Sequence, residues 1–247
     1  MKYKLLALDM DGTLLNDLHE ITPETEYWIR KAAAAGVHVC LSTGRSYDEA
    51  IPYGDQLNLG TPMITVNGSE IWKSPHELHR RILLDRSLIA RLYKISREKQ
   101  VWFWANSVEG SFNEGSWLPE LLERNHWLKF GYFTEDDAAR MAILQELEAM
   151  DAFQITNSSP HNLEINPKGV SKASGIQVVC KLLGLQMSEV VAIGDSLNDL
   201  AAIEAAGLGV AMGNAQELVK EKADVVTATN NEDGIAWIIR DYVLTEE

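Results

Sequence analysis

Cysteine is scarce in this sequence, since Cys40 and Cys180 are the only two among 247 residues. Two cysteines cannot build a disulfide framework or a zinc site. Both lie in apolar stretches, so we expect two reduced, buried thiols. The six histidines are scattered along the chain, which gives zinc no second set of ligands.

Long hydrophobic runs are also missing. No window reaches the roughly 18 apolar residues that a membrane span needs. The apolar run that begins at Leu5 meets Asp9 almost at once, so it is too short for a signal peptide. We therefore expect a soluble, cytoplasmic protein with no membrane partner.

Positive charge is in short supply: 22 Lys and Arg face 36 Asp and Glu, a formal net charge of −14. A nucleic-acid-binding protein normally presents a basic surface, so nucleic acid is not an expected partner. An acidic protein that handles an anion must gather its few cations, or a metal ion, at one place. The search for a site therefore starts from clusters of charge.

Short apolar runs alternate with helical patterns at both ends of the sequence. Pro23, placed after Thr22 and before acidic residues, indicates a helix start, and Gly36 indicates its end. Strands separated by helices of this length predict right-handed crossovers and a mostly parallel sheet. The predicted strands are 4–10, 37–42, 62–66, 190–193, 208–212 and 225–228. The predicted helices of the C-terminal part are 171–183, 196–206, 216–222 and 232–244.

The middle of the chain has a different composition, because five of the seven tryptophans fall between Trp72 and Trp127. We predict an inserted domain over 82–165, between the two parts of a core domain, 1–81 and 166–247. Its expected elements are a helix over 85–100, a strand over 101–104, a helix that Thr134 opens with a capping box, and strands over 152–157 and 162–165. Trp102 and Trp104 share one face of their strand, where packing on the sheet is favoured over stacking on a substrate.

The strongest chemical signal is Asp9-Met10-Asp11-Gly12-Thr13, directly after the first strand. Ligands gather at the carboxyl ends of parallel strands. Two acids one residue apart can share a pocket there, one as a nucleophile and the other as an acid and then a base. An Asp-rich helix cap is the alternative. A calcium loop is excluded because Leu14 stands where that loop needs Gly.

A second pair of acids, Asp195 and Asp199, follows the strand predicted over 190–193. Together with Asp9 and Asp11 they form a hard, all-oxygen ligand set that suits Mg²⁺. A helix N-cap is the alternative, and it is compatible with metal binding. A serine nucleophile elbow is excluded because Asn198 occupies its last Gly position.

Two further segments can hold an anion. Thr43-Gly44-Arg45 follows the second strand and offers hydroxyl and backbone N–H groups, although an ordinary helix cap explains it equally well. A lysine near the return from the insertion can supply positive charge to a phosphoryl group, and chemistry alone leaves Lys168 and Lys172 both open. No phosphate-binding P-loop is present, and the glycines at 207–213 miss the dinucleotide-binding spacing.

Taken together, these motifs resemble those of the haloacid dehalogenase superfamily of phosphatases, and most closely its Cof-type subfamily. The likeness spans the whole chain and also includes Asn67-Gly68 before the insertion. It implies an α/β fold, with a Rossmann-like parallel sheet core, helices on both faces and an inserted α/β cap (type IIB). The motifs that carry it are Asp9-x-Asp11-Gly12-Thr13, Thr43-Gly44-Arg45, Lys172 and Gly194-Asp195-x-x-Asn198-Asp199.

The resemblance also implies roles. Asp9 would take the phosphoryl group, while Asp11 would protonate the leaving alcohol and later activate water. Lys172, rather than Lys168, matches the family's Gly-Val-Ser-Lys arrangement, and Ala173 replaces a frequent Gly without consequence for the chemistry. The residues expected to hold the phosphoryl oxygens are Met10, Thr43, Gly44, Lys172 and Asn198. Those expected to hold Mg²⁺ are Asp9, Asp11 through its carbonyl, Asp195 and, in support, Asp199.

The expected function is therefore a Mg²⁺-dependent phosphatase that hydrolyses small phosphorylated metabolites, sugar phosphates first, through an aspartyl-phosphate. A flavin precursor or another phosphate ester is the nearest alternative, followed by a phosphomutase and then by a non-catalytic regulator that binds phosphate or metal. The cap is expected to close over the site and to select the substrate. A monomer and a homodimer are both compatible with the sequence.

Overall fold

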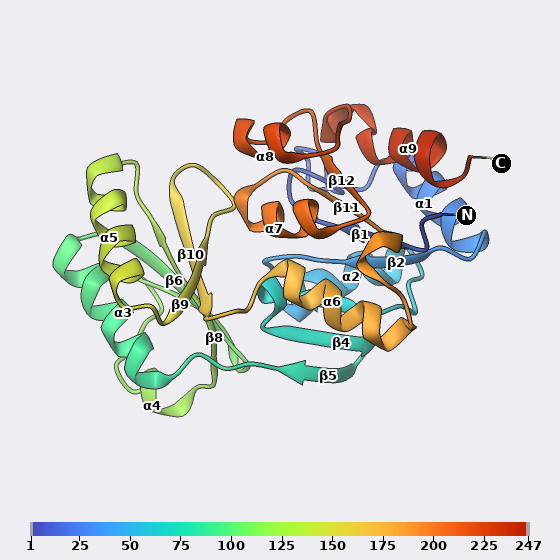
Figure 1. Ribbon diagram of the computed structural model, residues 1–247. Helices are drawn as coiled ribbons and strands as arrows, with labels where there is room; N and C mark the ends of the chain where they lie inside the picture. The colour runs from blue at the N-terminus through green and yellow to red at the C-terminus, as the bar shows by residue number, and fades with distance from the viewer. Residues whose placement is uncertain (1, 246–247) are drawn as a thin grey trace. The chain divides into compact units, whose positions relative to one another are not determined.

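The computed structural model describes residues 2–245, and the chain divides into two compact units. One unit joins the N-terminal segment up to Arg80 with the C-terminal segment from Lys172 onward, and we call it the core unit. The other comprises Arg81–Ser171, and we call it the cap unit. Figure 1 shows this division in its colours, since the blue and red ends of the chain belong to the same unit.

Five parallel strands form the main sheet of the core unit, in the order β13-β12-β11-β1-β2. The central strand, β11, pairs with β1 from the far end of the chain, Leu5 opposite Val190. The predicted parallel α/β core is therefore confirmed. The strands are β1 (Leu5–Leu8), β2 (His38–Leu41), β11 (Val190–Gly194), β12 (Leu208–Ala211) and β13 (Val225–Val226).

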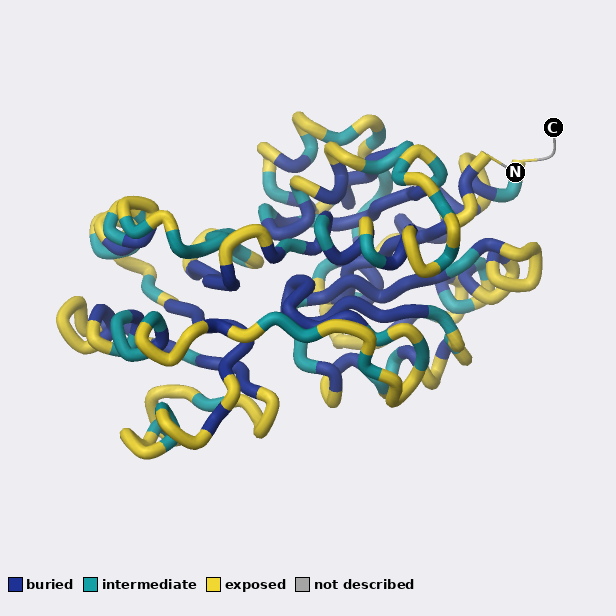
Figure 2. The backbone as a smooth tube through the Cα atoms, turned by 60° about the horizontal axis from the view of Figure 1, so that its bottom comes forward, coloured by how far each residue is buried: buried dark blue, intermediate teal, exposed yellow. Residues whose placement is uncertain are grey.

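Helices cover both faces of this sheet. Because side chains alternate along a strand, Leu6 faces the cluster that holds Ile29 of α1, whereas Leu5 faces the cluster that holds Ile176 of α6. Figure 2 shows the buried strands inside and the exposed turns outside. The helices are α1 (Pro23–Ala34), α2 (Tyr47–Gln56), α6 (Lys172–Leu183), α7 (Leu197–Ala205), α8 (Glu217–Lys222) and α9 (Gly234–Ile238).

The predicted strand over 62–66 is present as β3 (Met63–Thr65), but it belongs to a separate small sheet with the order β3-β4-β5. β3 runs antiparallel to β4 (Glu70–Ser74), and β5 spans Glu77–Arg81. The turn between β3 and β4 contains Asn67-Gly68, both with positive φ, as a hairpin turn requires. A single parallel bridge between Ser42 and Ile64 links β3 to the segment after β2.

The cap unit contains a five-stranded antiparallel sheet in the order β7-β6-β8-β10-β9. Its long helices, α3 (Arg86–Lys99) and α5 (Asp137–Ala149), lie on one face of that sheet (Figure 1). The short α4 spans Leu121–Arg124. The strands are β6 (Trp102–Ser107), β7 (Gly110–Asn113), β8 (Trp127–Phe133), β9 (Phe153–Thr156) and β10 (Asn162–Pro167).

The helix caps explain most of the helix starts. The Thr22 hydroxyl accepts from the N–H of Thr25, and Asp85 caps α3 in the same way. The predicted capping box at Thr134 is wrong, because Asp136 caps α5 and accepts from two backbone N–H groups. The Thr134 hydroxyl instead accepts a hydrogen bond from the N–H of Asp136, in the turn that precedes α5.

Other differences concern the ends of the chain and elements that the sequence did not reveal. The continuous helix predicted over 232–244 is broken into a 3₁₀ turn, α9 and a π-helical segment over Ile239–Val243. Local sequence patterns did not reveal α2, which contains Pro52, or strands β4, β5, β7 and β8. Within residues 2–245, no helix is long and apolar enough to cross a lipid bilayer.

Candidate active site

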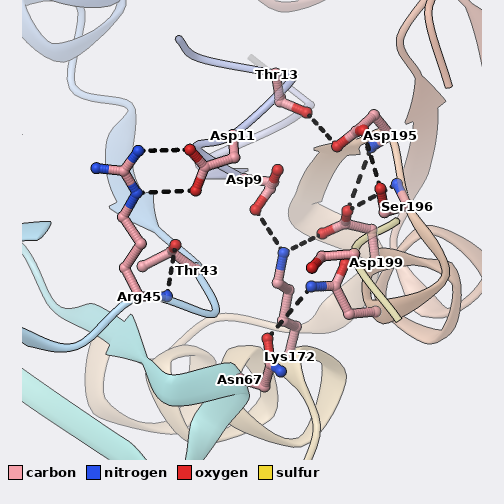
Figure 3. A network of polar contacts seen from close by, with 12 residues as sticks. Asp9, Asp11, Thr13, Thr43, Arg45, Asn67, Lys172, Asp195, Ser196 and Asp199 are labelled. Atoms are coloured by element: carbon pink, nitrogen blue, oxygen red, sulfur yellow. Dashed lines mark hydrogen bonds and ion pairs between the residues drawn. The ribbon is translucent and has the colours of Figure 1, made fainter. Parts of the chain in front are cut away.

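Asp9 and Lys172, 163 residues apart in the chain, meet in a buried ion pair (Figure 3). Asp9 follows β1 directly, and its N–H donates to the carbonyl of Ile193 on the neighbouring strand, 3.0 Å away. Lys172 is the first residue of α6, and its Nζ lies 2.5 Å from Asp9 Oδ1. Their exposed fractions are only 6% and 1%. A buried, paired lysine fixes the position of the carboxylate beside it.

Asp195 and Asp199 complete this cluster from the end of β11 and the first turn of α7. Lys172 Nζ also lies 2.7 Å from Asp199 Oδ1, so one ammonium group serves two carboxylates. One oxygen each from Asp9, Asp195 and Asp199 lies within 4.8 Å of the others. Three carboxylate oxygens this close form a hard ligand set, which fits a divalent cation such as Mg²⁺.

The charges of the cluster do not balance by themselves, since three carboxylates face one ammonium group. Burial, followed by the charge of Asp199, raises the pKa of Asp9 well above its usual value. Burial, followed again by Asp199, raises the pKa of Asp195 to about 6. Burial alone would lower the pKa of Lys172, but the attraction of Asp199 and Asp9 outweighs it and raises that pKa. The site therefore holds excess negative charge that a cation would neutralise.

The loop after β1 is held close to Asp195. Gly12 has a φ of +74°, and a Cβ atom there would lie 2.8 Å from Asp195 Oδ2, so only glycine fits this approach. Thr13 Oγ1 donates to Asp195 Oδ1 at 3.3 Å. Asn214 Nδ2 donates to the Gly12 carbonyl at 2.8 Å. Asn214 was not expected from the sequence, although its place after β12 repeats the pattern of polar residues at the ends of parallel strands.

The Asp11 side chain contacts Arg45 and His19 instead of the buried cluster. Arg45 Nε and Nη2 donate to the two Asp11 oxygens at 2.8 and 2.5 Å, a bidentate pair. His19 Nδ1 lies 3.8 Å from the same carboxylate. The hydrogen bond with Asp11 is the main cause that raises the pKa of Arg45. In Figure 3 the Asp11 carboxylate points toward Arg45, away from Lys172.

The remaining candidates surround the cluster within the core unit. Thr43 is buried, its N–H donates to the carbonyl of Ile64, and its Oγ1 accepts from the N–H of Arg45 at 3.1 Å. Asn198 Nδ2 donates to Asn67 Oδ1 at 3.4 Å, while Asn198 Oδ1 is buried with no hydrogen-bond partner within residues 2–245. Such an orphaned acceptor indicates a site built for a ligand or for water.

The three remaining candidates from the sequence are Met10, Gly44 and Lys168. Met10 is fully buried between the two acids of its motif, and Gly44 lies in the turn between Thr43 and Arg45. Lys168 belongs to the cap unit, where its exposed Nζ lies 2.6 Å from Asp151 Oδ2. Of the two lysines that chemistry left open, Lys172 is therefore the one in the acidic cluster.

Comparisons with known proteins agree on one family. A family model of haloacid dehalogenase-like hydrolases matches residues 6–140 and 112–239. The chain is 46% identical over 241 residues to the Bacillus subtilis 5-amino-6-(5-phospho-D-ribitylamino)uracil phosphatase YcsE, covering 98% of this chain and 96% of that protein. It is 31% identical to a second Bacillus subtilis phosphatase with the same substrate name, YitU, with coverages of 96% and 97%.

Solved structures lead to the same family. A haloacid dehalogenase-like hydrolase from Bacteroides thetaiotaomicron is 30% identical with a TM-score of 0.79, covering 97% of this chain and 99% of that one. One from Bacillus subtilis is 25% identical with a TM-score of 0.88 and the same coverages. The strand-end acids, the buried lysine and these similarities place the chain among the haloacid dehalogenase-like hydrolases, as a Cof-type phosphatase of phosphoric monoesters.

Proposed function

We propose that this phosphatase transfers the phosphoryl group of its substrate to Asp9. An Asp9 oxygen forms a bond to phosphorus as the bond from phosphorus to the leaving oxygen breaks, which leaves an aspartyl-phosphate. Water then attacks the phosphorus and releases inorganic phosphate. The observation that carries this proposal is the buried Asp9 carboxylate, held 2.5 Å from Lys172 at the end of a central strand. The ion pair holds the nucleophile in one orientation, as in-line attack requires.

Lys172 and Thr43 bind the phosphoryl oxygens in this scheme, helped by Asn198 and by the backbone N–H groups of Met10 and Gly44. The ammonium of Lys172 supplies positive charge where three equatorial oxygens accumulate negative charge. The Thr43 hydroxyl accepts from the N–H of Arg45, and its own hydrogen is then directed to another acceptor. The unpartnered, buried Asn198 Oδ1 fits a site that is completed by substrate and its water.

Asp11 moves the protons of both steps. It donates a proton to the leaving alkoxide and, as the resulting carboxylate, accepts one from the attacking water. Both Asp11 oxygens accept hydrogen bonds from Arg45, so neither can present a proton to the leaving oxygen until this pair opens. Asp11 lies half exposed, which leaves its side chain room to turn.

Mg²⁺ fits the acidic cluster and, when bound, neutralises the charge of the carboxylates and of the transferred group. Asp9, Asp195 and the carbonyl of Asp11 would hold it, with Asp199 in support. Burial, followed by the negative charge of Asp199, raises the pKa of Asp9 and of Asp195, and a cation bound between them would favour their ionised forms, which supports this assignment.

We expect Mg²⁺ to raise the midpoint of thermal unfolding at neutral pH, with or without substrate. A cation that binds only the folded state stabilises it by about 2.7 kcal/mol at a hundredfold excess over its Kd. Thermal scans with Mg²⁺ and with chelator measure the shift. In Asp195→Asn the shift should be largely lost, whereas Asp48→Asn, an exposed acid on α2, should keep it. An equal shift in both variants would place the cation elsewhere.

For the substrate we propose 5-amino-6-(5-phospho-D-ribitylamino)uracil. Support comes from the relatives named for this compound, of which one is 46% identical over 98% of the chain. The phosphate of this compound is carried on a ribityl chain, which is a sugar alcohol. The proposal therefore takes up the flavin-precursor alternative in place of the sugar phosphates that the sequence placed first.

A panel of phosphorylated metabolites tests this choice by the release of inorganic phosphate. We expect the highest kcat/KM for 5-amino-6-(5-phospho-D-ribitylamino)uracil, at least about tenfold above hexose and pentose phosphates, a difference of about 1.4 kcal/mol in transition-state binding. A higher value for a simple sugar phosphate would overturn the substrate. An isomerised phosphate ester without free phosphate would instead indicate a phosphomutase.

A further inference from the structure

The acids of the proposed mechanism, Asp9 and Asp11, stand on a loop whose shape depends on a glycine. This loop follows β1 in the core unit, and we call its residues 9–17 the β1 loop. Gly12 has a positive φ and lies close against the Asp195 carboxylate, where a Cβ atom would not fit. Glycine has more backbone freedom than any other residue. The orientation of the peptide groups beside Gly12 therefore depends on hydrogen bonds from other parts of the chain.

Asn214, in the loop after β12, supplies one of these hydrogen bonds. Its Nδ2 donates to the Gly12 carbonyl at 2.8 Å, and its Oδ1 accepts from the N–H of Asn230 at 3.0 Å. One side-chain amide thus joins the β1 loop to the segment after β13. Because Asn214 is exposed, water could satisfy both of its polar atoms, and burial does not require this arrangement. Its contacts explain the orientation of the Gly12 peptide better than they explain folding.

The loop that carries Asn214 is itself attached to two strand ends. The N–H of Gln216 donates to the carbonyl of Asp195 at 2.9 Å, and the N–H of Gly213 donates to the carbonyl of Ala228 at 3.0 Å. A Cβ atom on Gly213 would lie only 2.9 Å from the backbone nitrogen of Thr229, so the two loops are in close contact. Asn214 therefore reaches the β1 loop from a support that is hydrogen-bonded to Asp195.

Asn230 holds the next part of the β1 loop. It is 7% exposed, and its Nδ2 donates to the Leu15 carbonyl at 3.0 Å and lies 3.2 Å from Asp17 Oδ1. We call Asn214 and Asn230 the asparagine pair, because they are hydrogen-bonded to each other and each accepts or donates to fix the same loop. Together they fix two carbonyl groups of the β1 loop, those of Gly12 and Leu15.

The asparagine pair acts close to two groups proposed to hold Mg²⁺. The carbonyls on either side of the Asp11 carbonyl are both held, since Met10 accepts from the N–H of Leu15 at 2.9 Å and Gly12 accepts from Asn214. The next residue, Thr13, donates to Asp195 Oδ1 (Figure 3). The position of the Gly12 peptide thus affects both the Asp11 carbonyl and the Asp195 carboxylate. Groups that orient metal ligands change metal affinity by about 10- to 100-fold.

We propose that Asn214, supported by Asn230, is a positioning residue for the cation site. It holds the Gly12 peptide so that the Asp11 carbonyl and the Asp195 carboxylate face one point. This inference rests on the Mg²⁺ assignment made above and deepens it. Without Asn214 every ligand is still present, but the β1 loop samples several conformations. A cation that binds only one of them then binds more weakly, in proportion to the population of that conformation.

The test follows the midpoint of thermal unfolding as Mg²⁺ is added, without substrate. Asn214→Ala should need about tenfold more Mg²⁺ than the unaltered protein for the same upward shift. The Mg²⁺ concentration that gives half-maximal hydrolysis of p-nitrophenyl phosphate should rise in parallel. Without Mg²⁺ the variant should unfold within a few degrees of the unaltered protein, because Asn214 is exposed.

Asn231→Ala is the matched control. Asn231 is also exposed, donates to Asp17 Oδ2 at 2.9 Å and accepts from the N–H of Asp17 at 3.1 Å. Its removal deletes two hydrogen bonds to the far end of the β1 loop and none at Gly12. The Mg²⁺ dependence of Asn231→Ala should therefore match that of the unaltered protein.

The outcomes separate this inference from the cation site itself. If Asp195→Asn keeps the full Mg²⁺ shift, the proposed cation site is wrong and the positioning role falls with it. If Asp195→Asn loses the shift but Asn214→Ala needs no additional Mg²⁺, the cation site stands and Asn214 does not position it. Equal weakening in Asn214→Ala and Asn231→Ala, or a large loss of stability in Asn214→Ala, would assign Asn214 a structural role and overturn the inference.

Discussion

Replacing Asp9 by Asn is expected to abolish turnover and to leave the protein folded. The variant keeps the size of the side chain and an oxygen that can accept from Lys172 Nζ, but a neutral amide oxygen is too weak a nucleophile to form the acyl-phosphate intermediate. We expect kcat to fall by at least about four orders of magnitude, as for other nucleophiles that act within a catalytic unit. Hydrolysis of p-nitrophenyl phosphate with Mg²⁺ measures the effect.

Stability should change in the opposite direction. A carboxyl group whose pKa is raised in the folded state destabilises that state as the pH rises through this pKa, and Asp9 is such a group. Without divalent cations, Asp9→Asn should therefore unfold at the same temperature as the unaltered protein or at a higher one. Asp48→Asn should change neither property. Normal turnover by Asp9→Asn would refute the nucleophile, and a large loss of stability would assign Asp9 a structural role.

The sequence could predict the part of this site that depends on parallel strands. Asp9 and Asp195 each follow an apolar run, and strands paired in parallel bring their carboxyl ends to one edge, as β1 and β11 do. The choice of Lys172 over Lys168 came from the resemblance alone. Only three residues lie between the two lysines, yet α6 begins at Lys172, and the side chain of this first residue is directed into the acidic cluster.

Two features could not be predicted, because each depends on an element that local patterns do not reveal. The pair between Asp11 and Arg45 requires the turn before α2, a helix concealed by Pro52. The alternation of β6 showed that Trp102 and Trp104 share a face, but not which face. That choice depends on Gly131 in β8, an unpredicted strand, which admits the Trp104 ring. The face on which a side chain lies depends here on packing between strands that are distant in the sequence, and local propensity does not determine it.

Lys172→Met is expected to damage both stability and activity, in contrast to Asp9→Asn. Methionine fills a similar volume but leaves Asp9 and Asp199 without the ammonium group that lies 2.5 and 2.7 Å from them. Removal of one partner from a buried ion pair costs about 3–5 kcal/mol. At about 2–4 °C per kcal/mol for a protein of this size, the midpoint of thermal unfolding should fall by about 6–20 °C.

The matched control is Lys168→Met, in which an exposed lysine loses its partner Asp151. Exposed ion pairs contribute about 0–1 kcal/mol, so this variant should unfold within a few degrees of the unaltered protein and keep its turnover. Saturating Mg²⁺ should restore part of the lost stability of Lys172→Met, because a cation can replace the missing charge, but not its kcat, because the phosphoryl oxygens still lack their lysine. Restored turnover under these conditions would show that Lys172 only balances charge. Full stability without Mg²⁺ would show that the carboxylates need no partner.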